Sequence, residues 1–174
     1  TPAKGIWQAC ESTRHAGAKL ILIGPGDKNL VTYGEYLGEV STEERNRLLS
    51  RASAVLMPTQ YIEPFGNVSA EAQLCGTPVI SSDFGGFQES VEQGRTGYRC
   101  TSIGEYMQAI KLAPSLDRSY IRRRAQALYS TESAMVSYGQ YFRRLNDPAG
   151  TNSFAPGLET AQHKDGYGTQ FVHP

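Results

Sequence analysis

The chain has 174 residues, in which 17 lysine and arginine residues balance 17 aspartate and glutamate residues, so its formal net charge is zero. This length is enough for one domain with a sizeable core, and the charge balance argues against the broad positive surface of a nucleic-acid-binding protein. No apolar run approaches the roughly 20 residues that cross a bilayer, and we expect no secretory signal peptide.

The first predicted elements are a helix and a strand. Small and apolar residues recur at helical spacing over 6–13, and Gly17 is a common kind of helix stop. The continuous apolar run over 19–24 predicts a strand buried on both faces of a parallel sheet. Gly24 and Gly26 do not complete a dinucleotide-binding fingerprint, because the third glycine is missing and no apolar helix follows.

A second strand and a second helix follow along the chain. Residues 36–38 predict a short strand, and Ser41 with Glu44 has the pattern of a capping box. The helix after this box is expected to turn its apolar residues over 48–52 toward the core. Its charged residues, Arg45 among them, are expected to face water.

The most informative part of the chain follows a strand predicted over 54–58. A polar loop containing Glu63 leads into a helix that is expected to begin near Gly66 or Asn67 and to contain Glu71. Asn67 and Glu71 are four residues apart and therefore share one helix face, with Glu71 about 6 Å below the first turn. The start of this helix thus has an acidic residue on each side.

The start of this helix is predicted to bind phosphate. Its unpaired N–H groups and the positive end of the helix dipole attract an anion. Glu63 and Glu71 would flank the phosphate, where their carboxylates can accept hydrogen bonds from hydroxyl groups. A nucleotide sugar has this layout, because its ribose and its hexose lie on either side of a diphosphate. The spacing therefore predicts a nucleotide-sugar ligand.

The chain continues with alternating strands and helices. Residues 79–81 predict a buried strand, which leaves through Gly85 and Gly86 into a short helix containing Glu89. Such a turn lies at the carboxyl end of a strand, where open α/β sheets bind ligands. A short strand is predicted over 98–100, and its polar residues indicate an edge position.

Amphipathic helices complete the predicted domain. Their apolar stripes are expected in the core and consist of Ile103, Met107, Ile110, Ile121, Ala125, Leu128, Met135, Tyr138, Phe142 and Leu145. The basic run over 122–124 is expected to be a solvated helix face. From 146 onward the chain is rich in Gly, Pro, Asn and Thr, which predicts a domain over 1–145 and an irregular C-terminal tail over 146–174.

The alternation of strands and helices predicts the fold class, an α/β domain with a parallel sheet covered by helices on both faces. Cys10, Cys75 and Cys100 lie in apolar contexts, which is typical of reduced, buried thiols in a cytoplasmic protein. No cysteine or histidine pair has metal-ligand spacing, so we expect no metal site.

Three segments occur in order within this central region. They are Glu63-Pro64-Phe65-Gly66 through Glu71, then Cys75-Gly76-Thr77-Pro78-Val79-Ile80, then Gly85-Gly86 with Glu89. The series resembles the signature of the retaining glycosyltransferases of family 4 (GT4), which have the two-domain GT-B architecture. The resemblance covers residues 4–145 and matches the C-terminal, donor-binding half. It implies a Rossmann-like domain that binds a nucleotide-sugar donor for retaining, metal-independent hexosyl transfer without a cofactor.

The resemblance also implies roles for individual residues. The residues expected to bind the donor are Lys4, Glu63, Phe65, Gly66, Asn67, Val68 and Glu71. Glu63 would contact the hexose as the catalytic residue, and Glu71 would hold the ribose hydroxyls. The base pocket is expected at Gly38, Glu39 and Val40. A supporting role is expected for Gly85, Gly86 and Glu89.

Lys4 and Gly5 match a lysine-glycine pair whose lysine contacts the diphosphate together with an upstream arginine. That arginine would precede residue 1, so we expect the chain to be a piece of a longer enzyme and to be inactive alone. The expected partners are a nucleotide sugar and a missing N-terminal acceptor domain, through which the enzyme would contact a membrane peripherally.

Two alternatives stay open from the sequence. One is another GT-B enzyme, such as a phosphorylase or a nucleotide-sugar epimerase. The other is a stand-alone or inactive nucleotide-sugar-binding module that lacks an acceptor half. Because the base would be read mostly by backbone groups, the sequence does not select among UDP, GDP and ADP sugars.

Overall fold

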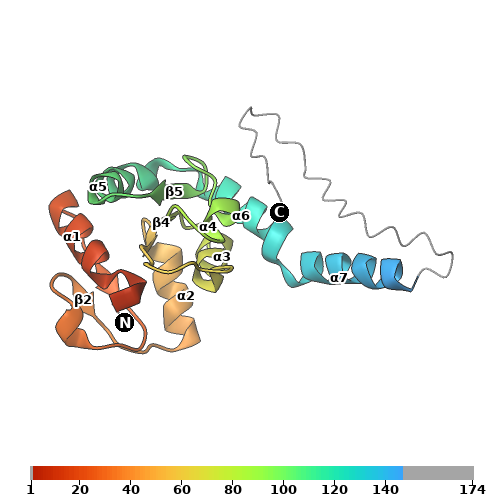
Figure 1. The fold of residues 1–174 in the computed structure, drawn as a ribbon, viewed down its shortest axis with the longest axis horizontal. Coiled ribbons are helices and arrows are strands. Elements are labelled where there is room, and N and C mark those ends of the chain that lie inside the picture. Colours follow the sequence, from red (N-terminus) through yellow and green to blue (C-terminus); the bar gives the residue numbers. More distant parts are fainter. Residues whose placement is uncertain (1, 147–174) are drawn as a thin grey trace, which may run out of the picture. The chain divides into compact units, whose positions relative to one another are not determined.

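A computed structural model describes residues 2–146 of the chain (Figure 1). The chain divides into two compact units, Thr1–Ala134 and a second unit that begins at Met135. From residue 147 on, the predicted irregular tail lies outside the described residues. The predicted domain boundary at residue 145 stays a prediction.

All the strand pairs of the described chain are parallel. The strands are β1 (Ile21–Leu22), β2 (Glu35–Tyr36), β3 (Val55–Met57), β4 (Val79–Ser82) and β5 (Gly97–Cys100). β1 pairs with β2, and β3, β4 and β5 form a separate sheet with β4 in the middle. This order confirms the expected edge position of β5. The parallel α/β class is confirmed, but its strands divide into two sheets.

The helices connect these strands in the order that the sequence predicts (Figure 1). The α-helices are α1 (Ile6–Ala16), α2 (Thr42–Arg51), α3 (Asn67–Leu74), α4 (Phe87–Ser90), α5 (Ile103–Leu112), α6 (Arg118–Tyr129) and α7 (Thr131–Leu145). Short 3-10 turns cover Pro2–Lys4 (η1), Lys28–Leu30 (η2) and Ala113–Ser115 (η3).

Only half of the predicted capping box forms at the start of α2. The Ser41 hydroxyl accepts a hydrogen bond from the Glu44 N–H at 3.2 Å, as expected for an N-cap. The Glu44 side chain does not complete the box, because Arg47 holds its carboxylate with hydrogen bonds of 2.6 and 2.7 Å.

Helices cover both faces of the larger sheet, as predicted. Val79 of β4 packs into a cluster with side chains of α2, α3 and α4, including Leu49 and Phe87. The next residue, Ile80, packs into a second cluster with Tyr106 of α5. Successive strand residues point to opposite faces, so β4 is buried on both sides and all four of its residues are buried.

The expectation that β1 is buried on both faces is wrong. Ile21 is exposed, whereas Leu20 is buried in a third cluster with Ala9 and Cys10 of α1. Within the described residues β1 pairs with β2 alone, so it is not enclosed by a larger sheet. Leu56 of β3 packs against both this cluster and the α5 cluster.

Several predictions for the C-terminal helices are wrong. In α5 the fully buried residues are Tyr106 and Ala109. The expected stripe of Ile103, Met107 and Ile110 is half-buried, and Ile110 packs against the α5 cluster. The predicted core residue Leu128 of α6 is exposed, and within their own compact unit so are Met135, Tyr138, Phe142 and Leu145 of α7. An apolar stripe shows that a helix has one apolar face, but it does not show whether another element covers that face.

The basic run over 122–124 is only partly a solvated face. Arg122 and Arg123 are exposed, whereas the Arg124 side chain is 15% exposed and pairs with a glutamate that lies outside the run. No helix within 2–146 has both the length and the apolar character that crossing a bilayer requires.

Candidate functional site

The loops that carry the expected site residues lie at the carboxyl edge of the larger sheet. β3 and β4 run parallel, so the loop after Met57 and the loop after Ser82 leave the same edge. A hydrogen bond of 3.1 Å between the hydroxyls of Thr59 and Ser82 joins the two loops. Both hydroxyl-bearing residues are buried, so this link fixes one loop against the other.

The glycine turn after β4 packs directly on the backbone around Glu63. The Gly86 N–H donates a hydrogen bond of 2.7 Å to the Glu63 carbonyl. A Cβ atom on Gly85 would lie 2.7 Å from the same carbonyl, and one on Gly86 would lie 2.7 Å from the Pro64 carbonyl. Any side chain at either glycine would push the Glu63 loop away. These contacts favour the predicted supporting role of the two glycines.

The N-terminus of α3 is open, as the sequence predicts. Gly66 is its N-cap at φ 81°, and no side-chain cap hydrogen bond is made there. Asn67 and Val68 of the first turn are exposed. The Glu63 side chain lies beside this terminus, because its Cγ would be 3.6 Å from a Cβ on Gly66. The terminus therefore offers N–H groups to an anion next to a carboxylate.

Lys4, Tyr61 and Glu63 form a polar cluster at this edge. The Tyr61 hydroxyl donates to Glu63 Oε2 at 2.7 Å and accepts a hydrogen bond from the Lys4 ammonium group. Lys4 Nζ also lies 3.5 Å from Glu63 Oε2. The hydrogen bond with Tyr61 raises the pKa of Lys4 above its usual 10.5, more than burial lowers it, and the Glu63 charge adds to the increase. Lys4 therefore stays cationic at neutral pH.

Close backbone packing places Lys4 over the Glu63 loop. Gly5, at φ 73°, approaches Pro58 so closely that a Cβ would lie 1.8 Å from the Pro58 carbonyl oxygen. The Gln60 N–H donates a hydrogen bond of 2.7 Å to the Ala3 carbonyl. Sequence reasoning identified the Lys4-Gly5 pair but missed Tyr61, whose one signal is that it lies two residues before Glu63 in the same loop.

Glu71 lies on α3 and pairs with Arg45 of α2, which the sequence led us to expect on a solvated helix face. Arg45 Nη2 of α2 is 3.3 Å from Glu71 Oε1. The other carboxylate oxygen, Oε2, is buried and has no hydrogen-bond partner within the described part of the chain. The expectation that Arg45 only faces water is wrong. The two residues are 26 positions apart on different helices, so no local pattern connects them.

The predicted base-pocket residues form the turn between β2 and α2. Gly38 has φ 72°, and its carbonyl accepts a hydrogen bond of 2.8 Å from the Gly24 N–H. Glu39 is exposed, Val40 is half-buried, and α2 begins just beyond them. Since α2 also carries Arg45, one helix links this turn to Glu71. Their role in a base pocket stays a prediction.

Two other predicted residues lie on the surface. The Phe65 ring is 52% exposed and packs edge-on against Tyr129 of α6, with 5.8 Å between the ring centroids. Glu89 is exposed on α4. The structure therefore brings Lys4 and Glu63 into contact but places Glu89 at the surface. The functions of Phe65 and Glu89 stay predictions.

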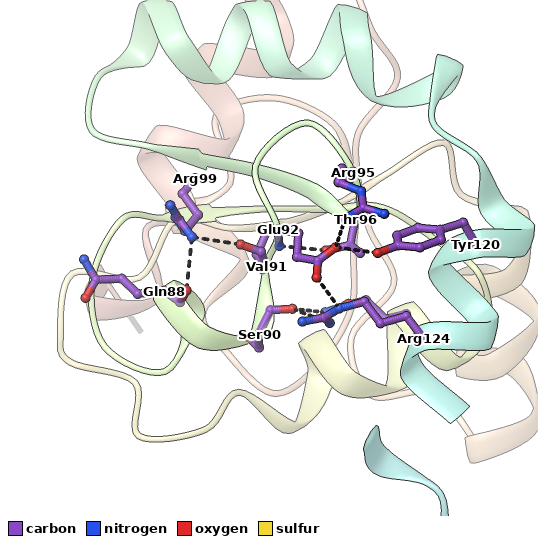
Figure 2. Close-up of polar contacts among 10 residues, drawn as sticks. Gln88, Ser90, Val91, Glu92, Arg95, Thr96, Arg99, Tyr120 and Arg124 are labelled. Carbon is purple, nitrogen blue, oxygen red and sulfur yellow. Dashed lines mark hydrogen bonds and ion pairs between the residues drawn. The ribbon is translucent and has the colours of Figure 1, made fainter. Parts of the chain in front are cut away.

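Two arginines hold the short helix that follows the glycine turn (Figure 2). Arg99 Nη1 of β5 donates to the carbonyls of Gln88 and Val91, at 3.1 and 2.9 Å. Arg124 of α6 donates to the Ser90 carbonyl at 3.3 Å. Positive groups at a helix C-terminus satisfy its free carbonyls and complement the helix dipole.

The same network contains a glutamate that the sequence analysis did not single out (Figure 2). Glu92 accepts hydrogen bonds from Tyr120 at 2.7 Å and from Arg124 at 2.8 Å. Burial by itself would raise the pKa of Glu92, but the hydrogen bond from Tyr120 and the charge of Arg124 outweigh it and lower the pKa below 4.5. Glu92 thus connects the segment after α4 to α6.

The cysteines and acids of the described chain form no metal-binding cluster. Cys10 and Cys100 are buried, Cys75 is half-buried, and all three are free thiols. Burial raises the pKa of Cys100 to about 12, so this thiol stays protonated. No three His, Cys, Asp or Glu residues within 2–146 are placed to hold a metal ion. The expected metal independence stays a prediction.

Known proteins resemble this chain in sequence over part of their length. Glycogen synthase of Mycobacterium tuberculosis is 34% identical over 97 residues, which cover 49% of this chain and 23% of the synthase. D-inositol 3-phosphate glycosyltransferase of a Nocardioides species is 39% identical over 87 residues, 50% of this chain and 18% of that enzyme. The matched part is therefore less than a quarter of either relative.

Solved structures resemble the chain over most of its length. AviGT4, a glycosyltransferase of avilamycin A biosynthesis, has a TM-score of 0.69 and 27% identity, covering 83% of this chain and 48% of AviGT4. Sucrose-phosphate synthase from Thermosynechococcus elongatus has a TM-score of 0.68 and 30% identity, covering 83% and 43%. Anabaena HepE, solved with UDP-glucose, shares the fold at a TM-score of 0.65 and 22% identity, covering 82% and 46%.

The family model for glycosyl transferases group 1 matches residues 4–113, which is more than half of the chain. This range contains the open terminus of α3, the Glu63 loop and the glycine turn. The predicted kinship and the GT-B type of fold are confirmed. The chain belongs to the glycosyl transferases group 1 family.

Proposed function

We propose that this chain is the donor-binding domain of a retaining, metal-independent hexosyltransferase. It binds a nucleotide-diphosphate sugar, and an acceptor domain elsewhere in the same protein completes the cleft. The observation that carries this proposal is the open N-terminus of α3, which has Glu63 beside it and Glu71 one turn further along the helix. Anabaena HepE, which has this fold, was solved with UDP-glucose.

Each proposed contact follows from the charge at its position. The diphosphate lies on the N–H groups of Asn67 and Val68, with the Lys4 ammonium group neutralising part of its charge. The Glu71 carboxylate, whose Oε2 has no hydrogen-bond partner within the described residues, accepts hydrogen bonds from the ribose hydroxyls. Glu63 faces the hexose. This order places the nucleoside toward α2 and the sugar toward η1 and the Tyr61 loop.

The reaction that this arrangement supports is the transfer of the hexosyl group from a phosphate oxygen of the donor to a hydroxyl oxygen of the acceptor. The bond from the anomeric carbon to the phosphate oxygen breaks, and its electron pair leaves with the nucleoside diphosphate. The acceptor hydroxyl then forms a bond to the anomeric carbon on the same face, and its proton passes to a phosphate oxygen of the leaving nucleoside diphosphate. Lys4 and the α3 N–H groups stabilise the leaving diphosphate, and the Glu63 carboxylate stabilises positive charge on the sugar.

The lengths of the relatives support a missing acceptor half. The chain covers 48% of AviGT4 and 43% of the sucrose-phosphate synthase. We therefore expect the chain alone to bind a donor and to transfer no sugar. The free thiols of Cys10, Cys75 and Cys100 support a cytoplasmic location, where thiols stay reduced.

Ligand-observed NMR of this chain against UDP, GDP and ADP, each with a sugar conjugate, tests donor binding. Glu71→Ala is expected to weaken nucleotide binding by about 1.5–3 kcal/mol, the usual contribution of a hydrogen bond to a charged group. Glu43→Ala removes an exposed acid of α2 and serves as the control. EDTA is expected to leave the affinity unchanged.

Two results would contradict the proposal. Absence of binding for all three nucleotides at millimolar concentration would remove the donor role of this chain. Equal weakening by Glu71→Ala and Glu43→Ala would show that Glu71 is only a surface acid. A separate result, loss of binding in EDTA, would overturn metal independence alone.

A further inference from the structure

We propose that Tyr61 is a positioning residue that couples recognition of the diphosphate to recognition of the hexose. This inference rests on the proposed donor-binding function. Its hydroxyl contacts both Lys4, which is proposed to bind the diphosphate, and Glu63, which is proposed to bind the hexose. It donates to Glu63 Oε2 at 2.7 Å and accepts from the Lys4 ammonium group.

The hydroxyl fixes the direction of the Glu63 carboxylate. Glu63 Oε2 has two partners, the Tyr61 hydroxyl and the Lys4 ammonium group at 3.5 Å. The Glu63 side chain is only 16% exposed, so few other orientations are open to it. The second carboxylate oxygen, Oε1, is left to accept a hydrogen bond from a sugar hydroxyl. Without the Tyr61 hydroxyl the carboxylate would rotate and lose this preference.

The Tyr61 side chain also guides Lys4. The Lys4 Nζ contacts the Tyr61 hydroxyl and lies 4.8 Å from the centroid of the ring, beyond its hydroxyl end. Lys4 is 56% exposed and has a long, flexible side chain, so its position depends on such contacts. Tyr61 thus holds the cation beside Glu63, whose own side chain lies beside the α3 terminus, where the diphosphate is proposed to bind.

The backbone around Tyr61 is fixed on two sides. The buried Thr59 hydroxyl bonds to Ser82 at 3.1 Å and donates to the Tyr61 carbonyl at 3.4 Å. On the other side, the Gln60 N–H bonds to Ala3 at 2.7 Å. The ring therefore projects from an anchored segment, and removal of one hydroxyl changes the cluster without releasing the loop.

The hexose contribution to binding measures this coupling. It is the ratio of the dissociation constant of a nucleoside diphosphate to that of its sugar conjugate, for UDP and UDP-glucose, GDP and GDP-mannose, and ADP and ADP-glucose. Tyr61→Phe keeps the ring and removes the hydroxyl. We expect the ratio to fall about tenfold, the lower range for one hydrogen bond to a charged group. Binding of the bare diphosphate is expected to change less than about twofold, because the variant retains the Lys4 charge and its ion pair with Glu63 at 3.5 Å.

A second tyrosine provides the control. Tyr33 is half-buried and donates its hydroxyl to the Ala18 carbonyl at 2.8 Å, outside the cluster. Tyr33→Phe is expected to leave the ratio unchanged. A thermal melt of each variant checks that it folds.

The outcomes separate this inference from the proposed function. An unchanged ratio in Tyr61→Phe would overturn the positioning role while leaving donor binding in place. Equal weakening of the diphosphate and its conjugate would show that Tyr61 has only a structural role. A wild-type chain that binds a diphosphate and its conjugate equally would overturn the coupling but not nucleotide binding. A wild-type chain that binds neither would overturn the proposed function and this inference together.

Discussion

At the scale of single residues, the Arg45–Glu71 pair illustrates how little stability an exposed ion pair provides. The two side chains are 37% and 35% exposed, and their closest atoms are 3.3 Å apart. Such pairs typically contribute about 0–1 kcal/mol because water screens them. The pair matters more for orientation, because Arg45 contacts Oε1 of Glu71 and leaves Oε2 without a hydrogen-bond partner among residues 2–146.

We therefore predict that Arg45→Gln affects binding more than folding. Nucleotide affinity is expected to fall about two- to tenfold, the range for the net contribution of one hydrogen bond. The melting temperature is expected to stay nearly unchanged. Titration calorimetry and a thermal melt would measure the two effects. Arg51→Gln, at an exposed position of the same helix, is the control, and an equal loss of affinity in both variants would contradict the prediction.

Gly5 makes the closest backbone approach near the site. A Cβ there would lie 1.8 Å from the Pro58 carbonyl oxygen, and its φ of 73° is unfavourable for other residues. Gly5→Ala is expected to destabilise the fold by about 2–5 kcal/mol, from backbone strain and overpacking together. It should also displace Lys4 and weaken diphosphate binding.

Gly17→Ala separates these two causes in a denaturation experiment. Gly17 has a similar φ of 70°, but nothing lies within 4 Å of the position of its Cβ. Gly17→Ala is expected to destabilise the fold only through backbone strain, by about 1–2 kcal/mol. If the two variants lost equal stability, the close approach to Pro58 would contribute nothing.

At the scale of elements, Glu92 connects the segment after α4 to α6 through Tyr120 and Arg124 (Figure 2). Its lowered pKa means that the folded chain favours the carboxylate more than the unfolded chain does. This contribution is complete above the unfolded pKa near 4.5 and is lost as the pH falls through the lower folded pKa. The network therefore makes stability sensitive to acid below about pH 4.5.

Glu92→Gln is expected to remove this sensitivity. Urea denaturation at pH 7 should show a loss of about 1–3 kcal/mol, because charged hydrogen bonds to Tyr120 and Arg124 are weakened. Between pH 5 and pH 3 the difference between wild type and variant should shrink. Glu35→Gln, which removes an exposed acid of β2, is expected to keep the wild-type profile. A constant difference across this pH range would contradict the assignment.

At the scale of the whole molecule, the buried clusters lie within the first compact unit. Every buried hydrophobic residue of the described chain precedes residue 126, and the last are Ile121 and Ala125 of α6. The larger apolar side chains of α7 are exposed. Residues 1–134 therefore contain the core that the structure describes.

We predict that a fragment of residues 1–134 folds cooperatively and binds nucleotide like the full chain. A fragment ending at residue 117 lacks α6 and exposes the surface that Ile121 and Ala125 cover, so it is expected not to fold. Circular dichroism melts and NMR binding would compare the two. A 1–134 fragment without a cooperative transition would show that residues beyond 134 complete the core.

The sequence by itself determined the local features of this protein. It predicted the buried strand over 79–81, the start of α3 at Gly66 or Asn67, and the glycine turn, because these depend on short-range periodicity and backbone preference. The motif series around Glu63 also predicted the family, which the match over residues 4–113 confirms.

Only the tertiary structure decided which of these residues meet. Lys4 and Tyr61 are 57 positions apart. The packing of Gly5 on Pro58 brings them together, and no local sequence pattern predicts that packing. The pairing of Arg45 with Glu71 likewise depends on how α2 and α3 pack. Helical periodicity identifies an apolar face but not its partner, so the burial of Tyr106 and Ala109 in α5 was also beyond the sequence. Contacts between distant segments depend on the packing of the whole chain, which no short stretch encodes.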